Sequence, residues 1–232
     1  MDHILLIDTS AETGTVALAT GGKVVSQRSS SDSRNFAAII NGLIDQVLAE
    51  ENIKASDLSA IAVCGGPGSY TGLRIGLSTA KGLCYALDKP LMMHNRLFLL
   101  VAQQYYKNLL KYDNYTAILP ARDKEFFITT YNNKLQAVQE PTHAFEADIQ
   151  PILAETAGTI FVTGSQNPYL ESLSADGRIH VEPNDILDIH SWAHYAFQQL
   201  DCNGFVNLAN SEPFYLKDVY THNSNKTNTL NK

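Results

Sequence analysis

The chain has 232 residues, of which 44% are hydrophobic, and a formal net charge of −7 at neutral pH. This length and composition predict a globular protein with one large domain or two modest ones. The acidic balance argues against a protein that holds nucleic acid by its own field, because phosphate binding usually requires a basic patch. If RNA is involved, we expect a partner subunit to bind it.

The cysteines and the lack of long apolar runs indicate in which cellular compartment we expect the protein. Cys64, Cys84 and Cys202 are widely spaced and form neither a CxxC pair nor a Cys/His cluster. They predict small buried side chains in a reducing compartment, not disulfides or a zinc site. The sequence shows no signal peptide and no apolar run near the ~20 residues that span a membrane. We therefore expect a cytoplasmic protein without a membrane partner.

The first part of the chain reads as three strands, a helix, a strand and a second helix. Hydrophobic periodicity places these elements at 4–7, 15–19, 23–27, 35–50, 60–64 and 71–87. Three strands before any helix do not match a Rossmann fold, in which a glycine-rich turn follows the first strand directly. Here the glycine-rich turn comes only after the fourth strand.

The second part also reads as strands first and helices after, although no internal sequence repeat links the two halves. Periodicity and a tight turn at Asn132-Asn133 place its elements at 91–94, 97–110, 115–119, 125–131, 134–139, 146–156, 159–163 and 191–200. Beyond Thr221 the chain is polar and asparagine-rich, which predicts a disordered tail at 222–232.

A glycine-rich loop joins the strand at 60–64 to the next helix. It reads Gly65-Gly66-Pro67-Gly68-Ser69-Tyr70-Thr71-Gly72-Leu73-Arg74-Ile75-Gly76. Glycines permit tight turns, Ser69 and Thr71 are natural N-caps, and a helix N-terminus presents unpaired amides to an anion. The loop is either a weak anion site or a structural turn in which backbones approach closely. Arg74 is a candidate contact to a neighbouring acidic group or carbonyl oxygen.

The helix at 71–87 is unusual because neither of its faces is strongly charged. One face is apolar, and the other consists of small or uncharged residues. The preceding helix, at 35–50, also presents small residues. The candidates for a partner interface on the two helices are Ala38, Gly42, Ile75, Thr79, Gly82 and Ala86. Small residues four apart let another backbone come close. Either both helix faces pack within this chain, or one of them belongs to a partner.

The motifs of the common enzyme classes are incomplete. Asp8 could hold a magnesium-bound phosphate in an actin-like ATPase, but the turn Asp8-Thr9-Ser10 has no glycine before Gly14. The glycine loop matches neither the Walker A motif nor G-x-S-x-G, and His190 and His194 lack the glutamate of HExxH. We therefore expect no catalytic residue, no metal site and no cofactor in this chain.

Several motifs resemble a known family. GGPGSYTGLRIG after a strand, preceded by ILLIDTSAETGTVAL, resembles the TsaB family, formerly YeaZ, of the bacterial tRNA threonylcarbamoyladenosine machinery. Ala121-Arg122-x-x-Glu125 is similar to that family's D-A-R-x-x-E segment, and the segment Pro213-Phe214-Tyr215-Leu216-Lys217 is similar to its terminal P-x-Y-L-R/K. Four motifs in the family's order cover the chain almost end to end.

The resemblance implies an α/β protein with the actin-like ATPase (ASKHA, ribonuclease H-like) fold and two βββαβα-type lobes, at 1–100 and 101–221. It implies a non-catalytic paralogue of TsaD, the subunit that modifies adenosine 37 of tRNA. Such a chain binds TsaD through helices of its N-terminal lobe and self-associates through the same surface. TsaE joins the pair, and tRNA is contacted through the complex. Any nucleotide site is expected at the complex interface and not within this chain. Asp8-Thr9-Ser10 is then a vestigial phosphate turn.

Two departures from the family pattern weaken any argument for metal binding or catalysis. Pro120 replaces the aspartate of D-A-R, and Arg34-Asn35-Phe36 lacks the histidine that the family often has at the start of its first helix. The alternative hypotheses are a nucleotide hydrolase or a glycoprotease-like peptidase of the same fold, and a homodimeric regulator acting alone.

Overall fold

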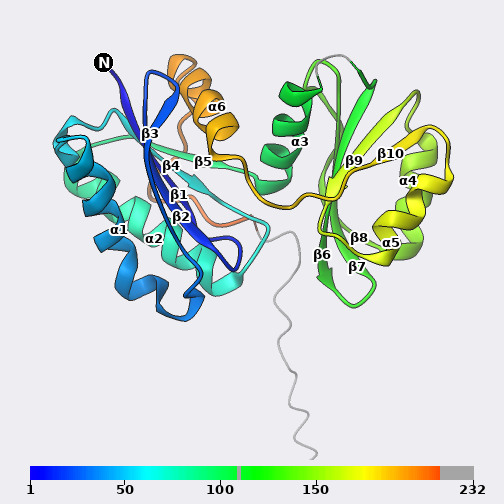
Figure 1. Ribbon diagram of the computed structural model, residues 1–232, viewed down its shortest axis with the longest axis horizontal. Coiled ribbons are helices and arrows are strands. Elements are labelled where there is room, and N and C mark those ends of the chain that lie inside the picture. Colours follow the sequence, from blue (N-terminus) through cyan, green and yellow to red (C-terminus); the bar gives the residue numbers. More distant parts are fainter. Residues whose placement is uncertain (109–110, 215–232) are drawn as a thin grey trace, which may run out of the picture.

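The computed structural model describes residues 1–108 and 111–214, which form two lobes (Figure 1). The first lobe contains β1 (His3–Asp8), β2 (Gly14–Thr20), β3 (Lys23–Ser30), α1 (Phe36–Glu50), β4 (Ala60–Cys64), α2 (Tyr70–Leu87) and β5 (Leu91–His94). The second contains β6 (Asn114–Arg122), β7 (Glu125–Asn132), β8 (Ala137–Phe145), α4 (Glu146–Glu155), β9 (Ile160–Gly164), α5 (Pro168–Ser172) and β10 (Ile179–Val181). Two further helices, α3 (Arg96–Lys107) and α6 (Ile189–Asp201), follow the two sheets.

Each lobe is built on a mixed five-stranded sheet, and the two sheets share one topology. The spatial order is β3-β2-β1-β4-β5 in the first lobe and β10-β9-β6-β7-β8 in the second. In each sheet the first strand in sequence pairs antiparallel with the second and parallel with the fourth. This is the two-lobed βββαβα arrangement expected from the sequence.

The elements lie close to their expected positions, with corrections in the second lobe. Its third strand was expected at 134–139 but spans Ala137–Phe145. The reason is the preceding turn, in which the Asn132 side chain accepts hydrogen bonds from the amides of Lys134 and Gln136, and Leu135 has a φ of 55°. Neither α5 nor β10 was expected, because both are too short to show a periodic pattern. The expected C-terminal end of the helix at 97–110 lies outside the described residues.

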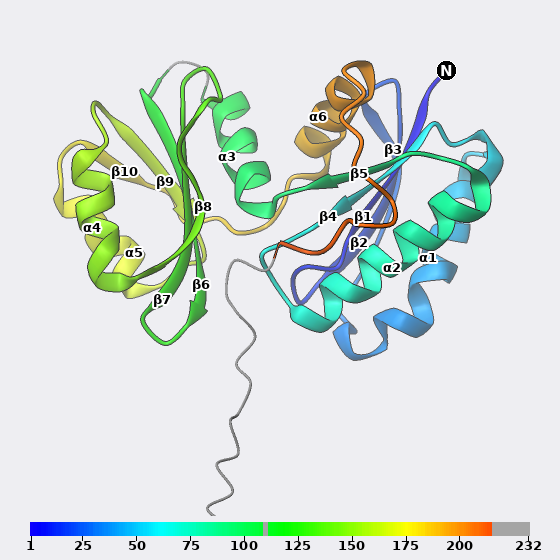
Figure 2. The same ribbon diagram turned by 180° about the vertical axis from the view of Figure 1, so that it is seen from behind.

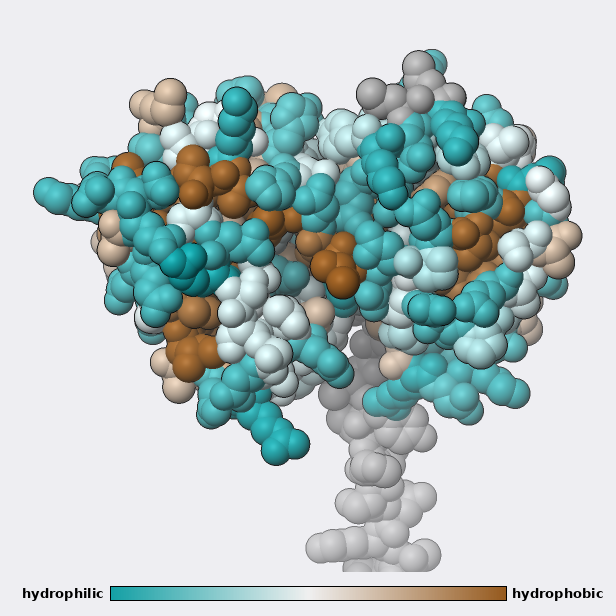
Figure 3. Space-filling model, in the orientation of Figure 1, coloured by the Kyte–Doolittle hydropathy of each residue, from teal (hydrophilic) through white to brown (hydrophobic). Residues whose placement is uncertain are grey.

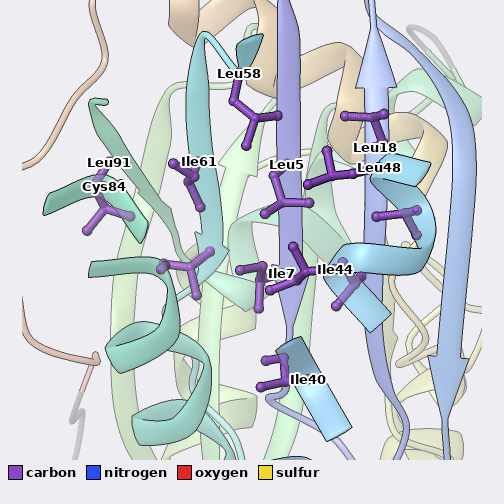
Figure 4. Packing of buried hydrophobic residues seen from close by; sticks show 14 of the residues in the cluster. Leu5, Ile7, Leu18, Ile40, Ile44, Leu48, Leu58, Ile61, Cys84 and Leu91 are labelled. Carbon is purple, nitrogen blue, oxygen red and sulfur yellow. The ribbon is translucent and has the colours of Figure 1, made fainter. Parts of the chain in front are cut away.

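Side chains that alternate along the strands build a core on each face of the first sheet. Leu5, Ile7 and Ile61 point toward α1 and α2, where they meet Ile44 and Leu48 (Figure 4). The opposite face is covered by α6, and most of the strand residues there are small. The alanines that pack against the α6 residues Trp192, Ala193 and Ala196 are Ala17, Ala19, Ala60 and Ala62. Small side chains on the sheet leave room for the buried indole.

The two helices that follow the sheets are exchanged between the lobes. Although α3 follows the first sheet, Leu97, Leu100 and Val101 of this helix pack on the second sheet. Conversely, α6 follows the second sheet and packs on the first (Figure 2). Residue 100 lies within α3, and the division of the chain into lobes at 1–100 and 101–221 stays a prediction. Within the described residues, no helix combines the length and the apolar character that a membrane span needs.

The glycine loop packs against the turn that follows β1. A Cβ on Gly68 would overlap the carbonyl oxygen of Ser10, and one on Gly72 would overlap that of Thr9. A Cβ on Gly76 would collide with the Thr9 hydroxyl. The glycines therefore allow two backbone segments to touch, which supports the structural interpretation of the loop.

Hydrogen bonds fix the same contact. The Ser69 amide donates to the Ser10 carbonyl at 2.8 Å, and the Thr9 hydroxyl donates to the Gly72 carbonyl at 2.6 Å. Ser69 is the N-cap of α2, since its hydroxyl accepts from the Gly72 amide at 3.2 Å. Thr71, the other expected cap, lies inside the first turn. Two amides of the proposed anion site are therefore bonded within the chain.

Gly72→Ala should destabilise the protein by about 2 kcal/mol or more, because the added methyl group meets backbone that cannot rotate away. Gly82→Ala in the same helix is the matched control, since its Cβ would meet no atom within 4 Å. It should stabilise the helix by roughly 0.5–1 kcal/mol. Urea denaturation measures both changes. Equal effects of the two substitutions would contradict the crowding at Gly72.

A buried histidine joins β5 to α6. The Trp192 indole N–H donates to Nδ1 of His94 at 2.7 Å. The Tyr195 ring packs against the imidazole, with 5.0 Å between the ring centroids. Burial lowers the pKa of His94 from 6.5 to about 3, and it raises the pKa of Tyr195 to about 12. Both side chains are therefore neutral near pH 7, and protonation of His94 opposes folding.

The stability contributed by neutral His94 is complete above pH 6.5 and is lost as the pH falls toward 3. Between pH 7 and pH 5 this loss amounts to about 2 kcal/mol, because each pH unit below the unfolded pKa costs about 1.4 kcal/mol. His94→Gln cannot titrate, so its unfolding free energy should fall by that much less over the same range. Urea denaturation of both proteins at the two pH values tests this. Parallel losses would show that the pKa of His94 is not lowered.

Candidate partner face and interlobe cleft

The residues expected to form a partner interface lie in the outer layer of α1 and α2. Ala38, Gly42, Gly82 and Ala86 are exposed, whereas Ile75 and Thr79 are half-buried. A Cβ at Gly42 or Gly82 would meet no atom within 4 Å. The described part of this chain therefore leaves these positions uncovered. We call the six residues the α1/α2 face; their role as an interface stays a prediction.

The sequence analysis missed Tyr85, which is 84% exposed and lies three residues after Gly82 on α2. A large aromatic among small residues, off the apolar face of its helix, was the available signal. Exposed tyrosines are common anchors of protein interfaces. Nearer the start of the helix, the Arg74 guanidinium lies 4.1 Å above the Tyr70 ring. The contact of Arg74 with an acidic group or carbonyl oxygen stays a prediction.

The turn Asp8-Thr9-Ser10 is buried beneath the glycine loop. One carboxylate oxygen of Asp8, Oδ1, accepts from the Ser10 amide at 2.9 Å and from the Ser10 hydroxyl at 2.6 Å. Ser10 is contacted in turn by the thiol of Cys64 at 3.5 Å, and burial raises the pKa of that thiol to about 12. The Asp8 carboxylate thus stabilises the turn to which it belongs, and the Cys64 thiol is unreactive.

A cleft between the lobes begins at this turn. One cavity of about 560 Å³ is lined by Asp8, Glu12, Arg96 and Asp185, among others. A second cavity of about 330 Å³ shares Glu12 and Arg96 and extends to Ser69 and the second lobe. Hydrophobic side chains lie among hydrophilic ones in the furrow between the lobes (Figure 3), and the exposed Ile186 lines the first cavity. Sequence reasoning missed Arg96 and Asp185, because neither belongs to a motif.

The Arg122 and Glu125 pair of the family motif lies in the second lobe, where the two residues face each other across β6 and β7. Glu125 forms a hydrogen bond with His143 of β8, at 2.8 Å between Oε2 and Nε2. The structure therefore separates these residues from the α1/α2 face. His143 was missed because it is 18 residues away in sequence. Among the described residues, no three His, Cys, Asp or Glu side chains gather as metal ligands would.

The C-terminal motif begins where the chain returns to the glycine loop. The Phe214 amide donates to the Gly65 carbonyl at 2.9 Å, and its ring fills the space beside Gly65. Upstream, Val206 bridges to Leu91 of β5. The segment therefore docks on the glycine loop up to Phe214. The motif residues 215–217 lie outside the described residues.

Comparison with known proteins places the chain among threonylcarbamoyladenosine proteins. The TsaD family model, described as tRNA N6-adenosine threonylcarbamoyltransferase, matches residues 23–198. The tRNA threonylcarbamoyladenosine biosynthesis protein TsaB of Bacillus subtilis is 30% identical over 165 residues, covering 69% of this chain and 70% of that protein. A tRNA N6-adenosine threonylcarbamoyltransferase of Prosthecochloris aestuarii is 33% identical over 109 residues, covering 41% of this chain. The match spans 32% of that transferase, about a third of its length.

Solved structures give the fold. YeaZ from Pseudomonas aeruginosa aligns with a TM-score of 0.69 at 20% identity, covering 93% of this chain and 100% of that chain. The two-lobed actin-like α/β fold expected from the sequence is thus confirmed. Sequence similarity to TsaB over two thirds of both proteins agrees with the structural alignment and with the order of the four motifs. The chain belongs to the TsaB (YeaZ) family.

Proposed function

We propose that this chain is a non-catalytic subunit in the synthesis of N6-threonylcarbamoyladenosine at position 37 of tRNA, and that it binds and activates a TsaD-type transferase. The name of the Bacillus subtilis relative supports the pathway. One observation carries the binding role. The α1/α2 face exposes glycines and alanines that no part of the described chain covers.

Two glycines of this face have no explanation inside the chain. A glycine within a helix costs roughly 0.5–1 kcal/mol relative to alanine. Gly72 and Gly76 are required by crowding against the β1 turn, but nothing crowds Gly42 or Gly82. A partner helix that comes close to these backbones supplies a reason, since small residues permit short distances between helix axes.

The same face also accounts for self-association, whereas the roles of TsaE, tRNA and nucleotide are proposed from the membership of the TsaB family. Tyr85 offers an aromatic anchor beside the small residues, as the centre of a protein interface requires. In the absence of TsaD, a second copy of this chain occupies the face and forms a homodimer. TsaE joins the pair, tRNA is bound through the complex, and nucleotide binds only at the contact with TsaD.

The Asp8 turn supports a non-catalytic role. In an ATPase of this fold, the turn after the first strand and the loop after the fourth strand bind the terminal phosphates. Here the carboxylate of Asp8 bonds to Ser10, and the Ser69 amide bonds to the Ser10 carbonyl. The two segments therefore bind each other.

Gly82→Phe should abolish copurification with TsaD, because the ring would stand between the approaching helices while leaving this chain uncrowded. Gly177→Phe is the matched control, since Gly177 is also exposed, also meets no atom within 4 Å and lies in the second lobe. It should copurify as the unsubstituted protein does. Circular dichroism establishes that both variants fold. Normal binding by Gly82→Phe would refute the assignment of the face.

Calorimetry with ATP and Mg²⁺ on the isolated chain distinguishes the scaffold from a nucleotide hydrolase of the same fold. We expect no heat of binding, because the segments that would hold the phosphates are bonded to each other. Tight binding that disappears in Asp8→Asn would favour the hydrolase. A peptidase would instead cleave protein substrates, and incubation with unfolded casein measures that activity.

A further inference from the structure

The interlobe cleft contains a buried arginine that forms no close ion pair, although carboxylates line the same cavity. Arg96 is only 8% exposed, and it forms no ion pair with any described residue. Of its three guanidinium nitrogens, Nη2 donates to the Asp185 carbonyl at 2.8 Å, whereas Nε is buried without a partner. Burying a cation without an anion is costly, so an anion from outside the chain would stabilise this site.

The position of Arg96 strengthens this requirement. It is the first residue of α3, where the helix dipole is positive, and the first turn contains no acidic residue. A cation at this end of a helix is electrostatically unfavourable. The first amides of the helix are already bonded to Asn95 and Gly66, so it is the Arg96 side chain that favours a negative group in the adjoining cavity.

Carboxylates line the same cavity on its other sides, and they too have unused hydrogen-bonding capacity. Asp8 uses Oδ1 for Ser10, and Asp185 uses Oδ2 for the Ser165 hydroxyl at 2.6 Å. The second oxygen of each carboxylate accepts no hydrogen bond from any described residue. The cavity thus holds one cation and several carboxylates that are not paired with each other.

We infer that the cleft binds a small zwitterion of the α-amino acid class. Its carboxylate lies at Arg96, and its ammonium group lies at Asp8 and Asp185. The cavity volume of about 560 Å³ is ample for such a molecule. A nucleotide fits less well, because a single arginine opposes several phosphate charges while Asp8, Glu12 and Asp185 repel them. This site goes beyond the proposed function and shares no residue with the α1/α2 face.

Calorimetry with each of the twenty common amino acids on the full chain tests the inference. At least one should bind, whereas acetate and methylammonium, which carry one charge each, should bind at least about tenfold more weakly. Asp8→Asn should reduce the affinity about tenfold or more, because the amide keeps the bond to Ser10 but loses the charge. Asp123→Asn, at an exposed hairpin position, is the matched control and should bind as the unsubstituted chain does.

Arg96→Gln provides a second variant, with circular dichroism to confirm folding, and should also lose binding. If Arg96→Gln does not fold, Asp8→Asn decides alone. Gly82→Phe should bind the amino acid normally, so failure of this inference and failure of the proposed function are distinguishable. The inference is overturned if no amino acid binds, if acetate binds equally well, if ATP binds more tightly, or if Asp8→Asn leaves the affinity unchanged.

Discussion

The contact between the glycine loop and the turn after β1 is the constraint on which the first lobe depends. It brings the backbones of Thr9 and Ser10 against Gly68 and Gly72, so that α2 begins at a fixed place over the sheet. The position of α2 then sets that of its outer face. Phe214 seals the other side of the loop at Gly65. The segment that would hold phosphates in an ATPase is therefore bonded here to the turn after β1.

Glycines in this chain occupy two different structural settings. Those of the loop are required by their own chain, as the overlap of a Cβ at Gly68 or Gly72 with backbone demonstrates. Those at Gly42 and Gly82 face open space. The same residue type thus marks internal close packing in one place and an uncovered helix backbone in another, and only the surroundings distinguish the two.

Local patterns explain which parts of the structure could be predicted. Periodicity placed β4 and α2, because buried strands and amphipathic helices leave a mark in sequence. Contacts between distant segments leave no such mark. Trp192 meets His94 across 98 residues, and Glu125 meets His143 from another strand. Arg96 was missed because its significance lies in the lack of a charged partner. The exposure of Gly82 could be suspected from composition, but only the packing shows that it is uncovered.

The exchange of helices between the lobes bears on how the protein is synthesised. The sheet of the first lobe is complete once β5 has been made, but the helix that covers its alanine-lined face is α6, almost a hundred residues later. Until Trp192 emerges from the ribosome, Ile4 and Leu6 lack the cover that α6 provides, and α3 contributes only Leu99 and Phe98 to that cluster. An exposed apolar sheet face promotes aggregation of folding intermediates. The first lobe therefore completes its core on that face only after the second lobe has been translated.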